Sequence, residues 1–412
     1  MRKDLVVQEV AAYPLPTPIG GIGTAITADR DRVDFKSLRV ARRERVLAAM
    51  EEADVDALIL GREPNVRYAS GARRLWVGSS RPFAPSCVLI RDTGKVHLMA
   101  FGGSADERPD DIDPDDVFCV SYDPGRLLKR VAAVPGLAAA RRVGVDGFSL
   151  FMRDSLSSIS PNAQFVGLEP QLRSLRRRKF PEELAAIRTA AAIAESGLSA
   201  AVARLAPGAS EKELQAAFLA RVCEIGTSEV TQHGTFTEIG PNGSLRWITS
   251  DSRCRAGTAV ALSAGVLWCG YEGTVARTWW CGHGREPSET QHELYQRWRR
   301  AVDAVVARCR PGATGTDLEA AYLETGEELP GRPIVYSVGM GHEGPVTAQG
   351  GGPGDDMVEA DMVLAVRAFI SSPAGGFLGE EMVHVGADRT EWITTLGHGP
   401  IAGGRNRFDL EG

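Results

Sequence analysis

Apolar residues recur along the chain at two spacings, and each spacing predicts a different kind of element. Residues 37–61 combine a helical repeat with the short apolar run Ala57–Leu60, which predicts an amphipathic helix followed by a buried strand. Two further apolar runs, APSCVLIR and KVHLMAF, flank the turn Asp92-Thr93-Gly94, and RRVGVDG supplies another strand. Strands that alternate with helices over about 140 residues predict a small α/β domain.

The second half of the chain has longer helical patterns. Pro181 stands at the start of FPEELAAIRTAAAIAESGLSAAVARL, a position where proline favours helix initiation. Ser210 with Glu213, and Ser288 with Gln291, have the spacing of a capping box and predict two more helix starts. Segments rich in Val, Thr, Trp and Phe lie between and after these helices, and they predict paired strands.

These changes of pattern divide the chain into three parts. Residues 1–35 are punctuated by Pro and Gly and predict an N-terminal arm. Residues 36–172 hold the α/β pattern, and residues 173–412 hold the pattern of helices and paired strands. A chain of 412 residues exceeds what one hydrophobic core usually holds, so two folded domains are expected.

Two segments resemble a known family of hydrolases. Val260–Gly282 reads VALSAGVLWCGYEGTVARTWWCG and keeps the frame of the family pattern D-x-G-(x)4-G-Y-x-x-D-x-x-R-T. The matching residues are Gly265, Gly270, Tyr271, Arg277 and Thr278. The pattern is that of the pita-bread hydrolases, which include aminopeptidase P, prolidase, methionine aminopeptidase and creatinase, and KFPEELAAIRTAAAIAESGL is similar to their lead-in helix. The resemblance covers roughly residues 38–400 and implies an α/β (α+β) chain. Its expected parts are a creatinase-like N-terminal α/β domain and a pita-bread domain with a curved antiparallel sheet backed by helices.

In this family five residues hold the metal ions, and most of those positions differ in this chain. The resemblance assigns them to Ser263, Thr274, His342, Arg367 and Glu380. Divalent cations need several carboxylates to offset their charge. Arg367 would add a permanent positive charge instead, and it is expected to pair with Glu380 across a hairpin. The sequence therefore predicts no metal and no other cofactor.

Creatinase is the metal-free member of this family, and the tail GADRTEWITTLGHGPIAGGRNR resembles its C-terminal ending. Its catalytic residues do not carry over. The position of its proton-transferring histidine is Arg246 here, its pocket glutamate is Ala276, and the second histidine of the family is Gln349. Neither the metallopeptidase nor the creatinase mechanism is therefore available unchanged.

The remaining polar residues suggest acid–base chemistry. His342 and Glu380 are predicted to transfer protons, because an imidazole beside a carboxylate is a usual general acid–base couple. The alternative is that hydrogen bonds merely hold both as remnants of the metal site. Arg246 and Arg367 are predicted to bind a substrate carboxylate as a guanidinium pair, or else to form structural salt bridges.

Five further residues are candidates for substrate contacts, although the sequence patterns around them are less specific. Trp247 would line the pocket beside Arg246, although aromatic residues on strands are more often core. His233 and Glu238 precede the first strand of the family motif, where a structural role is the alternative. Because the resemblance implies a homodimer, Arg73 and Arg74 are predicted to reach the pocket of the partner subunit; an exposed basic loop is the alternative.

Composition narrows the classes of function. A formal net charge of −6 gives no basic surface for nucleic acid. The chain has no run of about 18 apolar residues and no signal-peptide core, so it is expected to be cytoplasmic and not membrane-bound.

Three functions remain open on the sequence. The first is a metal-independent, creatinase-like enzyme that performs acid–base chemistry on a small amino-acid-derived or carboxylate-bearing metabolite. The reaction would be C–N bond hydrolysis, elimination or isomerisation. The second is a catalytically silent pita-bread module that binds a ligand or another protein. The third is a divergent metallopeptidase with substitute ligands such as Glu272, His233 or Glu381.

Overall fold

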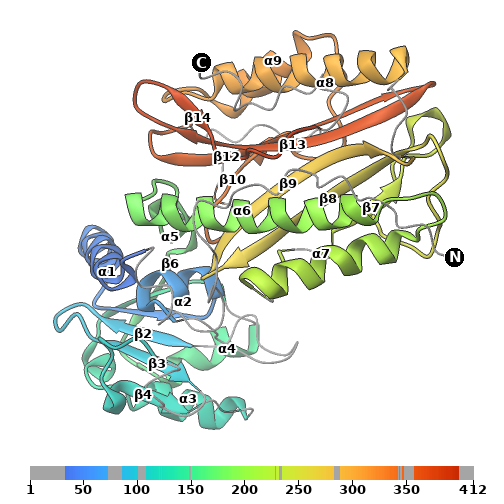
Figure 1. Cartoon of the computed structure of the whole chain (residues 1–412). Helices are drawn as coiled ribbons and strands as arrows, with labels where there is room; N and C mark the ends of the chain where they lie inside the picture. The colour runs from blue at the N-terminus through green and yellow to red at the C-terminus, as the bar shows by residue number, and fades with distance from the viewer. Residues whose placement is uncertain are drawn as a thin grey trace, which may run out of the picture. The chain divides into compact units, whose positions relative to one another are not determined.

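The computed structural model divides the chain into two compact units, Asp34–Arg176 and the residues from Arg177 onward (Figure 1). The structure describes residues 33–72, 86–100, 108–119, 121, 123–147, 150–227, 229–231, 234–282, 288–341, 343, 346–347 and 357–398. None of its described helices is long and apolar enough to cross a membrane.

The first unit is a six-stranded sheet with helices, in the strand order β4-β3-β2-β1-β5-β6. β1 (Ala57–Leu60) lies at the centre, antiparallel to β2 (Cys87–Ile90) and parallel to β5 (Arg142–Val145). All four residues of β1 are buried, as expected for a strand covered on both faces. The other elements are α1 (Phe35–Glu52), α2 (Glu63–Ser70), β3 (Val96–Ala100), β4 (Val117–Cys119), α3 (Pro124–Ala132), α4 (Leu150–Ser155), β6 (Gln164–Gly167) and α5 (Glu169–Leu175), with 3₁₀ turns at Pro114–Asp116, Leu137–Ala139 and Leu156–Ser158.

The second unit is an antiparallel sheet in the order β11-β10-β12-β13-β9-β8-β7, with β14 paired to β13. Its strands are β7 (Thr235–Glu238), β8 (Ala259–Trp268), β9 (Tyr271–Trp280), β10 (Val335–Ser337), β11 (Val346–Thr347), β12 (Met362–Ser372), β13 (Gly375–Val385) and β14 (Thr390–Trp392). Its helices are α6 (Pro181–Arg204), α7 (Glu211–Ile225), α8 (Glu289–Arg308) and α9 (Gly315–Leu323), with a 3₁₀ turn, η4, at Pro241–Gly243. The two units together confirm the fold class predicted from the sequence.

The helix starts agree with the sequence signals. Pro181 occupies the first turn of α6, and complete capping boxes begin α7 at Ser210 and α8 at Ser288. In each box the serine hydroxyl accepts a backbone N–H and the side chain three residues later accepts the serine N–H. These contacts depend on neighbouring residues alone, which is why the sequence predicts them.

The helices of the second unit cover one face of its sheet. α8 packs on alternate residues of β12 and β13, including Val366 and Phe377, with Trp298 buried among them. α6 lies along β9 on the same side (Figure 1). Since strand side chains alternate between faces, the residues between these, such as Ala276 and Leu378, point to the opposite side. This opposite side is called the inner face below.

Gly273 lies where α6 crosses β9. A Cβ there would be 2.1 Å from the carbonyl carbon of Ala190 and 2.2 Å from the amide nitrogen of Ala191. Backbone atoms cannot move aside as the end of a side chain can, so we expect Gly273→Ala to lower the free energy of unfolding by about 1–3 kcal/mol. Urea unfolding followed by circular dichroism measures this. Gly331→Ala is the control, because a Cβ there meets no atom within 4 Å; equal losses in both variants would contradict the prediction.

Candidate functional site

A row of paired residues crosses the inner face from β7 to β12. The register joins Thr235 to Ser263, Ser263 to Ala276, Ala276 to Glu380 and Glu380 to Arg367. Residues directly opposite one another in antiparallel strands point to the same face. Side chains that lie far apart in the sequence are therefore brought into one line on the inner face.

Arg367 and Glu380 form a buried ion pair at the end of this row. Arg367 Nε lies 2.5 Å from Glu380 Oε2, and the Glu380 side chain is fully buried. The Thr274 hydroxyl donates to Glu380 Oε1 at 2.6 Å, and the Tyr336 hydroxyl donates to Oε2 at 3.1 Å. Burial opposes the charge on Arg367, but the adjacent Glu380 outweighs it and raises the pKa of Arg367 above its ordinary value. The ion pair expected across the β12–β13 hairpin is thus confirmed.

A second carboxylate, Glu272, is buried near this pair. It precedes Thr274 by two positions on β9 and so shares its face. Its backbone N–H donates to the Gly339 carbonyl at 2.9 Å. Burial and the negative charge of Glu380 raise the pKa of Glu272 to about 7, although Arg367 acts in the opposite direction. A buried carboxyl group that changes charge near neutral pH is suited to holding and releasing a proton.

A cavity of about 530 Å³ opens beside Ser263 and Arg367. Trp247 forms part of its wall, and the guanidinium carbon of Arg332 lies 4.0 Å from the centre of the indole ring. That of Arg367 lies 5.9 Å from the same centre. The described residues that line the cavity are Gln215, Gly234, Thr235, Trp247, Ile248, Thr249, Ser263, Arg332 and Arg367. They include two arginines and no acidic residue, so the cavity favours an anionic or neutral polar ligand.

Arg246 forms a structural salt bridge, which the sequence left open as the alternative to binding a substrate carboxylate together with Arg367. Its Nη2 contacts both carboxylate oxygens of Glu211 at 2.6 Å, and it also donates to Ser250. Glu211 is fully buried at the start of α7, so Arg246 satisfies a buried charge. Arg332 and Arg367 are the two arginines among the described residues of the cavity wall. No pattern in the sequence distinguishes Arg332, because it lies in an irregular loop between α9 and β10.

The other sequence candidates have three different outcomes. Glu238 binds Arg255, and it accepts a hydrogen bond from the Thr258 hydroxyl at 2.9 Å, so its carboxylate is held by structural contacts. Trp247 lines the cavity as predicted. Four candidates lie outside the described residues: His342, His233, Arg73 and Arg74.

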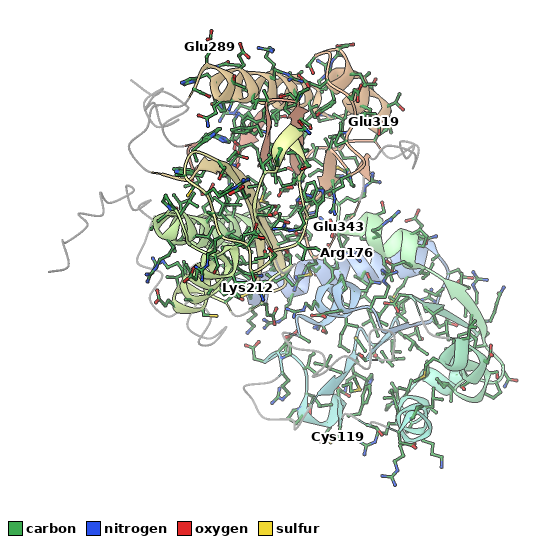
Figure 2. The ribbon with its side chains drawn as sticks, turned by 90° about the vertical axis from the view of Figure 1, so that its right-hand side faces the viewer. Cys119, Arg176, Lys212, Glu289, Glu319 and Glu343 are labelled. Atoms are coloured by element: carbon green, nitrogen blue, oxygen red, sulfur yellow. The ribbon has the colours of Figure 1, made fainter. Side chains whose placement is uncertain are left out.

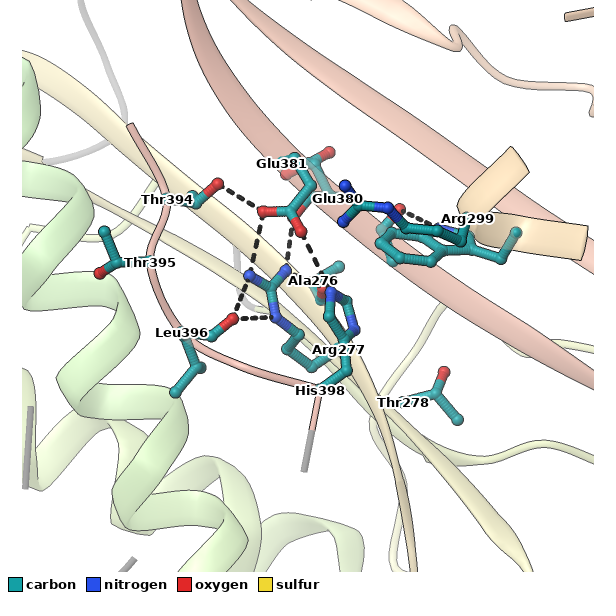
Figure 3. Close-up of polar contacts among 12 residues, drawn as sticks. Ala276, Arg277, Thr278, Arg299, Glu380, Glu381, Thr394, Thr395, Leu396 and His398 are labelled. Atoms are coloured by element: carbon teal, nitrogen blue, oxygen red, sulfur yellow. Dashed lines mark hydrogen bonds and ion pairs between the residues drawn. The ribbon is translucent and has the colours of Figure 1, made fainter. Parts of the chain in front are cut away.

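The opposite face of the sheet carries a separate polar network (Figure 3). Arg277 Nη2 lies 3.0 Å from Glu381 Oε2, and its Nε and Nη2 donate to the Leu396 carbonyl. Thr394 donates to the same carboxylate, and His398 Nε2 lies 3.1 Å from Glu381 Oε1. Because Glu381 points away from its neighbour Glu380, it anchors the segment after β14 and does not take part in the inner-face site.

The four described positions of the family's ligand set do not by themselves fit a divalent metal ion. Glu380 is the only carboxylate among the four described positions of the family's ligand set, and its oxygens already contact Arg367, Thr274 and Tyr336. The guanidinium beside it would repel a dication. Glu343, labelled in Figure 2, is held by Lys179 at 2.7 Å. Within the described part of the chain, no group of three or more His, Cys, Asp or Glu residues is arranged to hold a metal.

Comparisons with known proteins match both units. Residues 42–178 match the model of the creatinase/prolidase N-terminal domain, and residues 185–387 match that of metallopeptidase family M24. The Xaa-Pro dipeptidase of Pyrococcus furiosus is 24% identical over 371 residues, which are 86% of this chain and 97% of that protein.

Solved structures show the same fold. The prolidase from Pyrococcus horikoshii OT3 aligns with a TM-score of 0.71 at 20% identity, covering 87% of this chain and 99% of its own. The X-Pro aminopeptidase from Thermotoga maritima aligns with a TM-score of 0.71 at 19% identity, covering 86% and 98%.

Proposed function

Because the chain belongs to the creatinase, aminopeptidase P and prolidase pita-bread superfamily, we propose that it is a metal-independent hydrolase of C–N bonds in small amino-acid-derived compounds. Curated relatives named Xaa-Pro dipeptidase match nearly their whole length, which supports a peptidase-type hydrolase. The cavity on the inner face has a volume suited to a substrate of about dipeptide size.

The proposal that the enzyme needs no metal rests on the ion pair between Arg367 and Glu380. In the family, the resemblance places metal ligands at both positions. Here the guanidinium supplies the positive charge that neutralises Glu380. A fixed cation of this kind polarises a nearby substrate carbonyl by its charge and needs no bound ion.

Proton transfer is assigned to two residues of the family's ligand set and to one buried carboxyl group. His342 and Glu380 are the proposed acid–base couple, as the sequence predicts. Glu272, which is buried near Glu380, is a proposed proton reservoir, since its pKa of about 7 lets it change charge near neutrality. Ser263 and Arg367 contact the cavity and position the substrate. Elimination or isomerisation would use the same proton transfers, but the relatives favour hydrolysis.

The test is hydrolysis of Xaa-Pro dipeptides by protein purified without chelator, then assayed with and without a strong chelator. We expect the rate to be unchanged by the chelator, and elemental analysis to find much less than one metal ion per chain. His342→Ala should lower the rate by about 10²–10⁴-fold. Glu238→Gln should leave the rate within twofold, because among the described residues the Glu238 carboxylate contacts Arg255 and Thr258, which do not line the cavity. Bound metal whose removal abolishes activity would refute metal independence.

A homodimer is proposed as well, because the resemblance implies it. In that arrangement Arg73 and Arg74 would contribute to the partner's cavity. Light scattering of the purified chain gives its mass directly. A monomer with full activity would exclude a contribution from the partner.

A further inference from the structure

A groove of about 830 Å³ runs along the surface between α6 and α7. The two helices lie side by side (Figure 1), and Arg221 Nε on α7 donates to the Ser196 hydroxyl on α6 at 3.0 Å. They are closely packed, since a Cβ at Gly197 would be 2.6 Å from the ring of Phe218. None of the described residues that line this groove also lines the cavity on the inner face, so the groove is a separate surface.

The middle of the groove is apolar and its side chains are small. Leu219 stands beside it on α7 and has 37% of its surface exposed, although the outward face of a solvated helix is usually polar. Small side chains let a neighbouring helix approach until the two axes are about 8–10 Å apart. The groove is therefore shaped to receive another helix. Six of its eleven described lining residues are alanines, namely Ala200, Ala203, Ala209, Ala216, Ala217 and Ala220.

The two ends of the groove carry balanced charges. Arg204, the last residue of α6, and Glu213, in the first turn of α7, lie at one end. Arg221 and Glu224 lie at the other end and form an exposed ion pair at 3.3 Å. Each end thus has one positive and one negative charge. A second copy of the same groove offers an opposite charge to each of them whichever way it docks, whereas a purely acidic or basic partner would be repelled by half of them.

From these features we propose that the groove between α6 and α7 is an interface between two copies of this chain. The ridge of α7 around Leu219 of each copy packs into the groove of the other, so the same surface is used twice, as in a two-fold symmetric pair. The arginines and glutamates at the ends then exchange partners between the copies. This interface is independent of the proposed hydrolysis. It is also separate from the contact that would bring Arg73 and Arg74 to the partner's cavity, and a chain that makes both contacts forms a tetramer.

The first experiment measures the mass of the full chain by light scattering during gel filtration. Ala220→Arg places a long charged side chain in the middle of the groove, at an exposed helical position, and should halve the mass of the assembly. Ala307→Arg makes the same change on the exposed face of α8 and should leave the mass unchanged. Arginine favours the helix, so both variants should fold, which circular dichroism verifies.

The second experiment tests the charges by making two complementary variants. Arg204→Glu with Arg221→Glu leaves only negative charges at the ends of the groove, and Glu213→Lys with Glu224→Lys leaves only positive ones. Each double variant alone should self-associate about tenfold or more weakly than the unchanged chain, because like charges then face each other. An equimolar mixture should recover the mass of the unchanged assembly. A purely structural role for these residues would not produce recovery on mixing.

Three results would overturn the interface: an unchanged chain with the mass of a single chain, an unaltered mass for Ala220→Arg, or no recovery in the mixture. The first of these would mean that any occupant of the groove is a different protein. Hydrolysis of Xaa-Pro dipeptides is measured separately on the same samples. Its absence would refute the proposed hydrolase and leave the interface, whereas a single-chain mass with hydrolysis would refute the interface and leave the hydrolase.

Discussion

Substitution of Arg367 by Met is expected to lower the free energy of unfolding by about 3–5 kcal/mol, because it leaves a buried carboxylate without its cation. The Glu380 side chain is fully buried and has Arg367 Nε at 2.5 Å. The two hydroxyls of Thr274 and Tyr336 would remain, but neutral donors do not replace a full charge. Urea unfolding at pH 8, monitored by circular dichroism, measures the loss.

Two controls test whether the effect comes from the charge. Arg255→Met removes an exposed arginine that also contacts a glutamate, and it should leave the urea midpoint almost unchanged. The double variant Arg367→Met with Glu380→Gln should recover much of the loss, because no buried charge is then unpaired. If Arg367→Met alone were as stable as the natural chain, the ion pair would not contribute to the free energy of unfolding.

Substitution of Glu272 by Gln is expected to stabilise the protein at alkaline pH. The pKa of Glu272 is raised from 4.5 to about 7 by burial and by Glu380. The folded chain therefore holds this proton more tightly than the unfolded chain does, and the cost of ionising the buried group is fully present above pH 7 and absent below pH 4.5. A shift of this size corresponds to about 3 kcal/mol, so Glu272→Gln should gain up to roughly that amount at pH 8.

The pH dependence distinguishes charge from packing. The gain from Glu272→Gln should shrink as the pH falls from 7 toward 4.5, where the natural side chain is also neutral. Glu224→Gln, which changes an exposed glutamate of α7, should show no such dependence. A gain of equal size at both ends of the range would show that packing, not ionisation, is responsible. A stabilising substitution that also abolished hydrolysis would fit a functional role for Glu272, since active sites often sacrifice stability.

The relation between Arg367 and Glu380 was predictable because a β-hairpin fixes its own register. The two residues are separated by a short turn, and a continuous ladder from Met362 to Val385 places them opposite each other. The helix starts at Ser210 and Ser288 were predictable for a similar reason, since their partners lie three residues away. The family frame around Gly265 and Arg277 then identified the fold.

The partners of the other arginines were not predictable, because they come from distant segments. Arg246 forms an ion pair with Glu211, which lies 35 residues earlier in the chain at the start of α7. Arg332 lies outside the helices and strands, so no periodic pattern predicts its neighbours, yet the fold places its guanidinium on Trp247. The raised pKa of Glu272 depends on burial and on Glu380 from another strand.

The sequence by itself determined the elements, the family frame and the ion pair of one hairpin, because periodicity, capping and hairpin register act between residues that are close along the chain. Only the tertiary structure decided that Arg246 pairs with Glu211 and that Arg332 lines the cavity. Electrostatic and stacking contacts depend on distances in space, and those distances exist only after the strands of the sheet have assembled.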